Sequence, residues 1–228
     1  MDLGLSGKRV AILATDGVEQ VELLQPRDAL EAAGARTELL APKAGEIQAF
    51  NHFEKGERLR VDRVLGEARA AEYSALLLPG GVVNSDTLRG EPAAVQFVRE
   101  MMLADKPVAA ICHGAWLLVE ADAVAGRTLT SWPTLKTDIK NAGGTWVDEP
   151  VHVDDRLVTS RKPADIPYFN KLMVTEFGNR LAESQLDQLS EASFPASDPP
   201  PGPGSAAGAS ASTTASRTSG RSDTDTRP

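Results

Sequence analysis

Cysteine and histidine are scarce in this chain. Its 228 residues contain one cysteine and three histidines. A single cysteine cannot close an internal disulfide, and one cysteine with three histidines supplies too few soft ligands for a structural zinc site. We therefore expect the thiol of Cys112 to be free and reduced, and we expect no metal centre.

A surplus of basic residues and a long apolar run are also missing. The 24 lysines and arginines face 32 aspartates and glutamates, a net charge of −8, and no basic cluster is interleaved with aromatics. This composition disfavours nucleic acid as a partner. No segment approaches the roughly 18 apolar residues of a membrane helix, and the N-terminus lacks the pattern of a secretory signal. We expect a cytoplasmic protein without membrane contact.

Large apolar side chains disappear after Phe194. Residues 195–228 contain no aromatic and no large aliphatic residue. Such a segment cannot bury enough surface to offset the entropy lost on ordering. We predict a folded domain over residues 1–187 and a disordered tail, rich in Pro, Gly, Ser and Ala, over residues 188–228.

Short apolar segments alternate with segments of helical spacing in the predicted domain. Buried strands are predicted at residues 8–14, 36–42, 73–81 and 106–111, and helices at residues 21–35, 91–105, 114–124 and 163–186. Pro26 should kink or divide the first helix. The more polar residues 45–65 suit a small exposed hairpin at the sheet edge. The alternation predicts an α/β fold, a flavodoxin-like, doubly wound and mostly parallel sheet sandwiched by helices.

Three short segments follow predicted strands and should meet at one edge of the sheet. They read A-T-D-G-V-E (14–19), L-P-G-G (78–81) and C-H (112–113). In open sheets of this type, ligands bind beyond the carboxyl ends of the strands. The sequence therefore predicts a site built from these three turns.

Cys112 occupies the place of a nucleophile on a tight strand-to-helix turn. Such a turn requires small residues two positions before and two after the nucleophile, and Ala110 and Gly114 satisfy this requirement. A lone cysteine between apolar segments is more often a core residue. The spacing, the adjacent His113 and the abrupt return of helical spacing favour a reactive thiol, whose pKa a helix N-terminus should lower.

Amides and carboxyls near the thiol are the next candidates. The amide of Gly80 or Gly81 could form an oxyanion hole with the amide of His113. Glu19 and Glu22 open the first predicted helix, where acids interact favourably with the helix dipole, and either could instead reach the thiol. The sequence alone leaves that choice open.

Taken in order, these motifs resemble the ThiJ/PfpI superfamily, in particular its PfpI-like intracellular peptidase and stress-protein branch. The resemblance rests on A-A-I-C-H-G-A, L-L-L-P-G-G, D-G-V-E-Q-V-E-L, T-S-W and V-T-S-R-K-P-A-D, and it covers about residues 8–180. It implies that Cys112 is the nucleophile, that Glu19 hydrogen-bonds its thiol and that His113 is the neighbouring histidine. It further implies that an acid of a neighbouring subunit, here Asp86, orients this histidine in a homodimer or larger homo-oligomer.

Two functions are compatible with these residues. In the first, the Cys112 thiolate attacks the carbonyl of a peptide or of a small or glycated substrate, and the Gly81 and His113 amides hold the oxyanion. This chemistry needs no cofactor, and Trp132 would line the pocket or belong to the core. In the second, the chain is a redox-responsive stress protein or chaperone in which Cys112 is oxidised.

Overall fold

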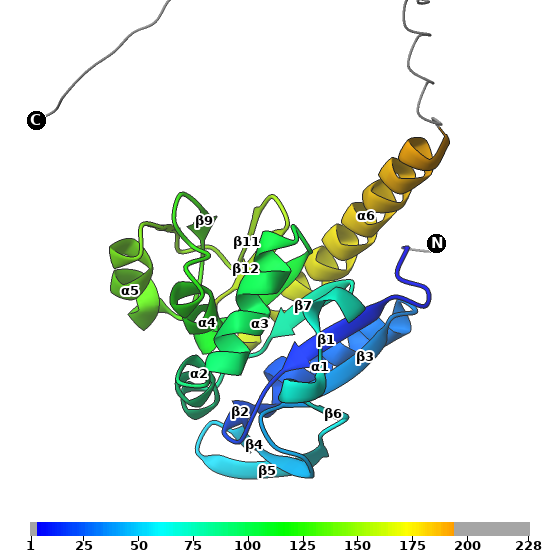
Figure 1. Ribbon diagram of the computed structural model, residues 1–228. Coiled ribbons are helices and arrows are strands. Elements are labelled where there is room, and N and C mark those ends of the chain that lie inside the picture. Colours follow the sequence, from blue (N-terminus) through cyan, green and yellow to red (C-terminus); the bar gives the residue numbers. More distant parts are fainter. Residues whose placement is uncertain (1–3, 194–228) are drawn as a thin grey trace, which may run out of the picture.

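The computed structural model describes residues 4–193, and a seven-stranded sheet forms its centre (Figure 1). The strand order is β11-β12-β8-β7-β1-β3-β6, and every neighbouring pair is parallel except β11 with β12. In chain order, these strands are β1 (Arg9–Leu13), β3 (Arg36–Ala41), β6 (Arg63–Val64), β7 (Ala75–Leu78), β8 (Val108–Ile111), β11 (Val151–Asp154) and β12 (Leu157–Ser160). The chain leaves β1 toward β3 and later returns to pair β7 on the other side of β1, so the winding reverses between β1 and β7.

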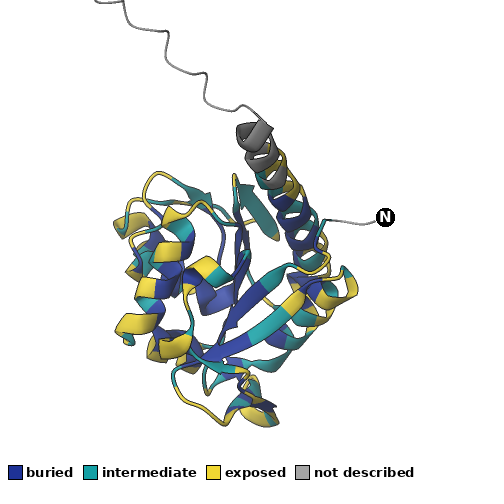
Figure 2. Ribbon diagram, turned by 45° about the vertical axis from the view of Figure 1, so that its right-hand side comes forward, coloured by how far each residue is buried: buried dark blue, intermediate teal, exposed yellow. Residues whose placement is uncertain are grey.

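Helices cover both faces of this sheet. One face carries α1 (Gln20–Ala32) and α6 (Ile166–Ser193), and the other carries α2 (Val82–Arg89), α3 (Pro92–Leu103), α4 (Ala115–Glu120) and α5 (Lys136–Asn141). Successive strand residues point to opposite faces, so Ile12 joins the core under α1 and α6, and Leu13 joins the core under α3 and α4. Figure 2 shows the buried strands between helices whose outer faces are exposed. The predicted flavodoxin-like α/β sandwich is confirmed.

Smaller elements complete the described chain. A three-stranded sheet contains β2 (Val18–Glu19), β4 (Glu46–Asn51) and β5 (Glu54–Arg60), and a two-stranded one contains β9 (Thr128–Leu129) and β10 (Thr145–Trp146). Single 3-10 turns span Leu65–Glu67, Ala70–Glu72, Cys112–Gly114, Pro133–Leu135 and Pro163–Asp165. The hairpin predicted within residues 45–65 is present, but it pairs with β2, and only β6 joins the edge of the central sheet.

Three further features differ from the sequence-based expectations. Helix α1 continues through Pro26, since the burial of Leu23, Pro26 and Leu30 against the sheet offsets the missing hydrogen bond. Helix α2, after the Gly pair, was not predicted. Helix α6 extends to Ser193, beyond the expected end near residue 186, and the rest of the predicted tail lies outside the described residues. None of the helices within residues 4–193 is both long and apolar enough to cross a bilayer.

Candidate active site

Cys112 lies on a sharp turn between β8 and α4. Its φ is +60°, a left-handed conformation that residues other than glycine seldom adopt. Gly114 permits the turn, because a Cβ at this position would collide with the carbonyl oxygen of Leu78. The Trp132 amide donates a hydrogen bond of 3.2 Å to the Cys112 carbonyl and holds the turn from outside. The structure thus contains the strained strand-to-helix turn expected from the small residues around the cysteine.

The carboxyl beside the thiol belongs to Glu22, which corrects the expectation for Glu19. Glu22 is fully buried beside the Cys112 thiol, and its Oε2 accepts the Gly80 N–H at 3.1 Å. Glu19 is the last residue of β2, and its Oε2 accepts the backbone N–H of His52 at 3.1 Å. Because α1 begins at Gln20, Glu22 lies in its first turn and faces the carboxyl ends of the strands.

Burial determines the protonation of this pair. Desolvation, followed by the charge of Glu19, raises the pKa of Glu22 to about 8, so its carboxyl is neutral at pH 7. Burial and then the charge of Glu22 raise the pKa of the Cys112 thiol, and the hydrogen bonds from the His113 and Gly81 amides do not compensate. The lowered thiol pKa predicted from the helix N-terminus is therefore not found, because the sulfur is more deeply buried than the sequence pattern indicated.

His113 supplies a neutral base next to the sulfur. Its Nδ1 lies 3.3 Å from the Cys112 Sγ. Its ring stacks on Trp132, with centroids 5.9 Å apart, and meets Trp116 edge to face at 5.1 Å. Burial lowers the pKa of His113 to about 4, so the imidazole is neutral at pH 7 and can accept a proton. Trp132, half-buried, forms part of the wall of the site.

The two glycines after β7 have different roles. The Gly80 N–H donates a hydrogen bond to the Glu22 carboxyl. The Gly81 N–H, like that of His113, is directed at Cys112. Gly81 has a φ of +90°, and a Cβ there would collide with the Gly17 carbonyl oxygen. Gly81 and His113 are thus the amides placed to meet a developing oxyanion.

Asn84 is a site residue that the sequence analysis missed. Its side chain is completely buried, and its Nδ2 donates to the carbonyls of Pro79 at 3.2 Å and Gly80 at 2.9 Å. Its Oδ1 accepts the Thr15 N–H at 2.7 Å. One amide therefore ties the turn after β1 to the turn after β7. The only sequence signal for it was an Asn three residues beyond the Gly pair.

A pocket of about 760 Å³ opens above the sulfur. Its lining residues are Asp16, Gly17, Glu19, Glu22, Gln48, Phe50, His52, Phe53, Gly81, Val82, Val83, Cys112, His113, Trp132 and Pro163. The wall is mainly apolar, as in sites for small organic molecules. Asp86 is exposed on α2 and does not line the pocket, so one chain alone does not bring it to the site.

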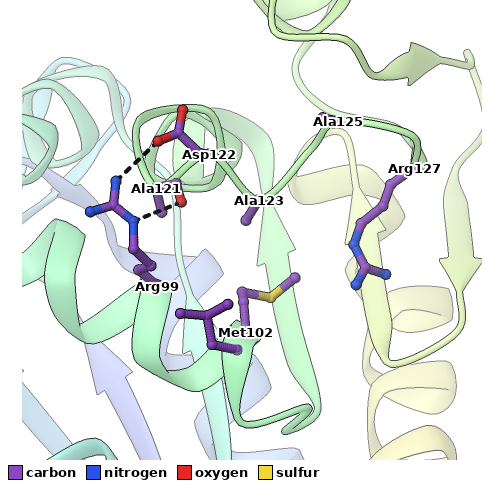
Figure 3. Close-up of a pocket in the computed structure, with 8 residues that line it drawn as sticks. Arg99, Met102, Ala121, Asp122, Ala123, Ala125 and Arg127 are labelled. Atoms are coloured by element: carbon purple, nitrogen blue, oxygen red, sulfur yellow. Dashed lines mark hydrogen bonds and ion pairs between the residues drawn. The ribbon is translucent and has the colours of Figure 1, made fainter. Parts of the chain in front are cut away.

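A second, smaller hollow of about 240 Å³ lies at the opposite edge of the sheet (Figure 3). It is bounded by the end of α3 and the loop after α4, and its lining residues are Arg99, Met102, Leu103, Ala121, Asp122, Ala123, Ala125 and Arg127. Both arginines have carboxylate partners, Asp122 for Arg99 at 3.2 Å and Asp154 for Arg127 at 3.5 Å. Its lining residues include no cysteine and no histidine, so the hollow lacks the reactive groups that surround Cys112.

Comparison with known proteins places this geometry in a family. The sequence profile of the DJ-1/PfpI family matches residues 8–176, which contain the whole site. The chain belongs to the DJ-1/PfpI family. A curated member, protein/nucleic acid deglycase 2 of Escherichia coli (strain K12), is 42% identical over 166 residues, or 72% of this chain and 94% of that protein. An uncharacterized member of Staphylococcus epidermidis is 40% identical over 169 residues, 73% of this chain and 96% of its own length.

Solved structures of the family have the same fold. A two-domain protein of Anabaena variabilis, with DJ-1/ThiJ/PfpI-like and ferritin-like domains, superposes with a TM-score of 0.71 at 34% identity, covering 75% of this chain and 48% of that chain. The Schizosaccharomyces pombe DJ-1 structure gives a TM-score of 0.65 at 20% identity over 77% of this chain and 97% of its own. The second likeness concerns the fold alone.

Proposed function

We propose that the protein is a cysteine-dependent, stress-protective enzyme of the deglycase or glyoxalase type, acting on small 2-oxoaldehydes and on their adducts with amines. The observation that carries the proposal is the position of the Cys112 sulfur beneath a pocket of about 760 Å³, between the His113 imidazole and the Glu22 carboxyl. The deglycase name of the Escherichia coli relative supports the same substrate class.

The first chemical step follows from the protonation states. The thiol is neutral at pH 7, so the neutral His113 Nδ1, 3.3 Å away, takes its proton as the sulfur attacks the aldehyde carbon. The C–S bond forms, the carbonyl π pair moves to oxygen, and the Gly81 and His113 amides stabilise that oxygen. The oxygen then receives the proton, giving a hemithioacetal.

An amine adduct enters the same path by substitution. The C–S bond forms while the C–N bond breaks, and the amine leaves with the proton that the thiol released, so that again a hemithioacetal remains. Transfer of hydrogen from its carbon to the neighbouring carbonyl carbon, with a proton moving to the carbonyl oxygen, gives a thioester. Water hydrolyses that thioester to a 2-hydroxy acid and the free thiol.

Replacement of the sulfur tests the proposal directly. We expect Cys112→Ser to lower kcat/KM on methylglyoxal and on a methylglyoxal-treated lysine peptide by at least about 10³-fold, because an alkoxide is not formed under these conditions. Asp122→Asn, at the opposite edge of the sheet and 88% exposed, serves as the matched control. Full activity of Cys112→Ser would overturn the proposal. Cleavage of unmodified peptides by the wild type, without consumption of methylglyoxal, would favour the peptidase alternative.

A redox-sensing role is the second candidate. The observation favouring it is the carboxyl of Glu22, which is neutral below a pH of about 8 and lies beside the only cysteine, where it could hydrogen-bond a sulfinate. Treatment with stoichiometric peroxide followed by mass spectrometry separates the candidates. Rapid oxidation of Cys112 together with negligible turnover would favour the sensor.

An oligomer is part of the proposal. Asp86 lies on the exposed side of α2, so it can reach a site only in another copy of the chain. Val82 and Val83, on the same helix, border the pocket and are 53% and 61% exposed, which leaves apolar surface for a second copy to cover. We propose a homodimer or larger homo-oligomer in the cytoplasm, in which Asp86 of one copy orients His113 of another.

A further inference from the structure

The pocket above Cys112 is lined by acids and by no lysine or arginine among residues 4–193. Three carboxyl groups line it, those of Asp16, Glu19 and Glu22. Glu22 is neutral below a pH of about 8 and His113 is neutral above a pH of about 4. Near neutral pH the fixed charge of the lining is therefore negative and comes from Asp16 and Glu19.

Hydrogen bonds hold both carboxylates in the lining of the pocket. Asp16 Oδ1 accepts the Gln48 N–H at 2.7 Å. Glu19 Oε2 accepts the His52 N–H at 3.1 Å and lies 3.6 Å from the Nδ1 of that residue. These bonds join the turn after β1 to the hairpin of β4 and β5. Both carboxylates are thus fixed in the lining, Asp16 at its exposed part and Glu19, whose side chain is 12% exposed, closer to Glu22.

The arginine nearest in sequence to the lining residues is itself paired with two acids. Arg161, close in sequence to the lining residue Pro163, is held by Asp148 at 2.6 Å and by Asp165 at 2.9 Å. The side chain of His52, which also lines the pocket, is 78% exposed. A ligand that enters the pocket therefore meets negative potential before it reaches Cys112.

A buried polar atom indicates that the inner pocket binds a polar group of a ligand. The Oε1 of Glu22 is buried and has no hydrogen-bond partner within the described residues, whereas Oε2 accepts the Gly80 N–H. Unpartnered buried polar atoms are costly, and of the five within the described residues this is the one in the pocket lining. A neutral carboxyl at this place can exchange hydrogen bonds with a hydroxyl or carbonyl oxygen of a bound substrate.

We propose that this site selects its substrates by charge. It admits neutral and cationic carbonyl compounds, including adducts carried on the side chains of basic peptides, and it disfavours anionic ones, such as 2-oxoaldehydes that carry a carboxylate. Asp16 and Glu19 determine this specificity. The claim about substrates rests on the proposed enzymatic function. The claim that charge controls which reagents reach the Cys112 thiol does not.

Two alkylating agents that differ in charge test the selectivity without reference to catalysis. Iodoacetamide is neutral and iodoacetate is anionic, and both label Cys112 alone, since it is the only cysteine. Mass spectrometry gives the two second-order rates for the full chain and for free N-acetylcysteine. We expect the preference for iodoacetamide to be about tenfold greater in the protein than in the free thiol, because like charges repel at close range.

Isosteric variants locate the origin of the preference. Asp16→Asn and Glu19→Gln keep an acceptor oxygen for the hydrogen bonds of Gln48 and His52, so both should fold. The double variant should bring the preference close to that of free N-acetylcysteine, while the control Asp122→Asn should leave it unchanged. Added salt should reduce the preference in the wild type because the carboxylate of Asp16 is exposed to solvent. A preference equal to that of the free thiol, or one that the double variant does not change, overturns the proposal.

The substrate arm compares methylglyoxal, which is neutral, with 4,5-dioxopentanoate, a 2-oxoaldehyde that carries a carboxylate and can follow the same reaction path. We expect kcat/KM for the anionic 2-oxoaldehyde to be at least about tenfold lower, and we expect the double variant to narrow the ratio. Equal turnover of the two 2-oxoaldehydes would overturn the charge selectivity and leave the proposed function intact. Failure to consume methylglyoxal would overturn the function, and the alkylation rates would still decide the selectivity.

Discussion

Replacing Glu22 by glutamine should change how the stability of the fold depends on pH. Burial raises the pKa of this carboxyl from its ordinary value of 4.5 to about 8. Between these values the folded chain holds a proton that the unfolded chain has lost. The stabilising contribution of the protonated group is complete below about pH 4.5 and is lost as the pH rises through about 8.

The size of the effect follows from the same values. The free energy of unfolding should fall by about 1.4 kcal/mol for each pH unit in that window, or by about 5 kcal/mol in all, from this group alone. Glu22→Gln keeps an acceptor for the Gly80 N–H and has no proton to lose. Its free energy of unfolding should therefore lack this contribution, and the variant should become steadily more stable relative to the wild type as the pH rises.

Urea denaturation of both proteins at several pH values within the window measures the difference. Glu100→Gln, which alters an exposed carboxyl on α3, is the control and should give curves parallel to the wild type. A constant free-energy difference between Glu22→Gln and the wild type across the window would refute the reasoning. That result would mean that the Glu22 carboxyl is ionised in the folded protein at neutral pH.

Three other predictions concern the turn, the base and the oligomer. Gly114→Ala should destabilise the fold by about 1–3 kcal/mol in urea denaturation, because its Cβ would meet a carbonyl oxygen. Because the pKa of His113 is lowered to about 4, kcat/KM on methylglyoxal should not fall through protonation of this residue until the pH approaches about 4. A fall in kcat/KM with a midpoint near pH 6.5 that His113→Gln removes would contradict the lowered pKa. Asp86→Asn should lower kcat/KM by about 10²-fold, and mixing it with Cys112→Ser should restore part of the activity; no restoration on mixing would contradict a site shared between subunits.

The central sheet and the turn at Cys112 were predictable because local signals determine both. Apolar runs with glycine punctuation gave β1, β7 and β8, and the small residues around Cys112 indicated the sharp turn. The hairpin was predictable from its alternation, whereas its pairing with β2 was not, because that pairing joins strands far apart in sequence.

The electrostatics of the site could not be read from the sequence. Glu19 directly precedes helix α1, and Glu22 lies in its first turn. The residue at which the helix begins therefore decides which of the two carboxyls faces the thiol. The raised pKa of Cys112 depends on burial by segments remote in the chain, which outweighs the local effect of the helix N-terminus. Asn84 was missed for a similar reason, since its three partners belong to two separate turns.

The bonds of Asn84 and Glu22 have a consequence for the order of folding. The first joins positions 69 apart in sequence, to Thr15, and the second joins positions 58 apart, to Gly80. Such distant partners meet only after β1, β7 and β8 have aligned, so an incompletely folded chain has a cysteine but no reaction centre. Shielding of that single sulfur from a thiol reagent during refolding would accordingly mark the moment at which the last of these segments docks.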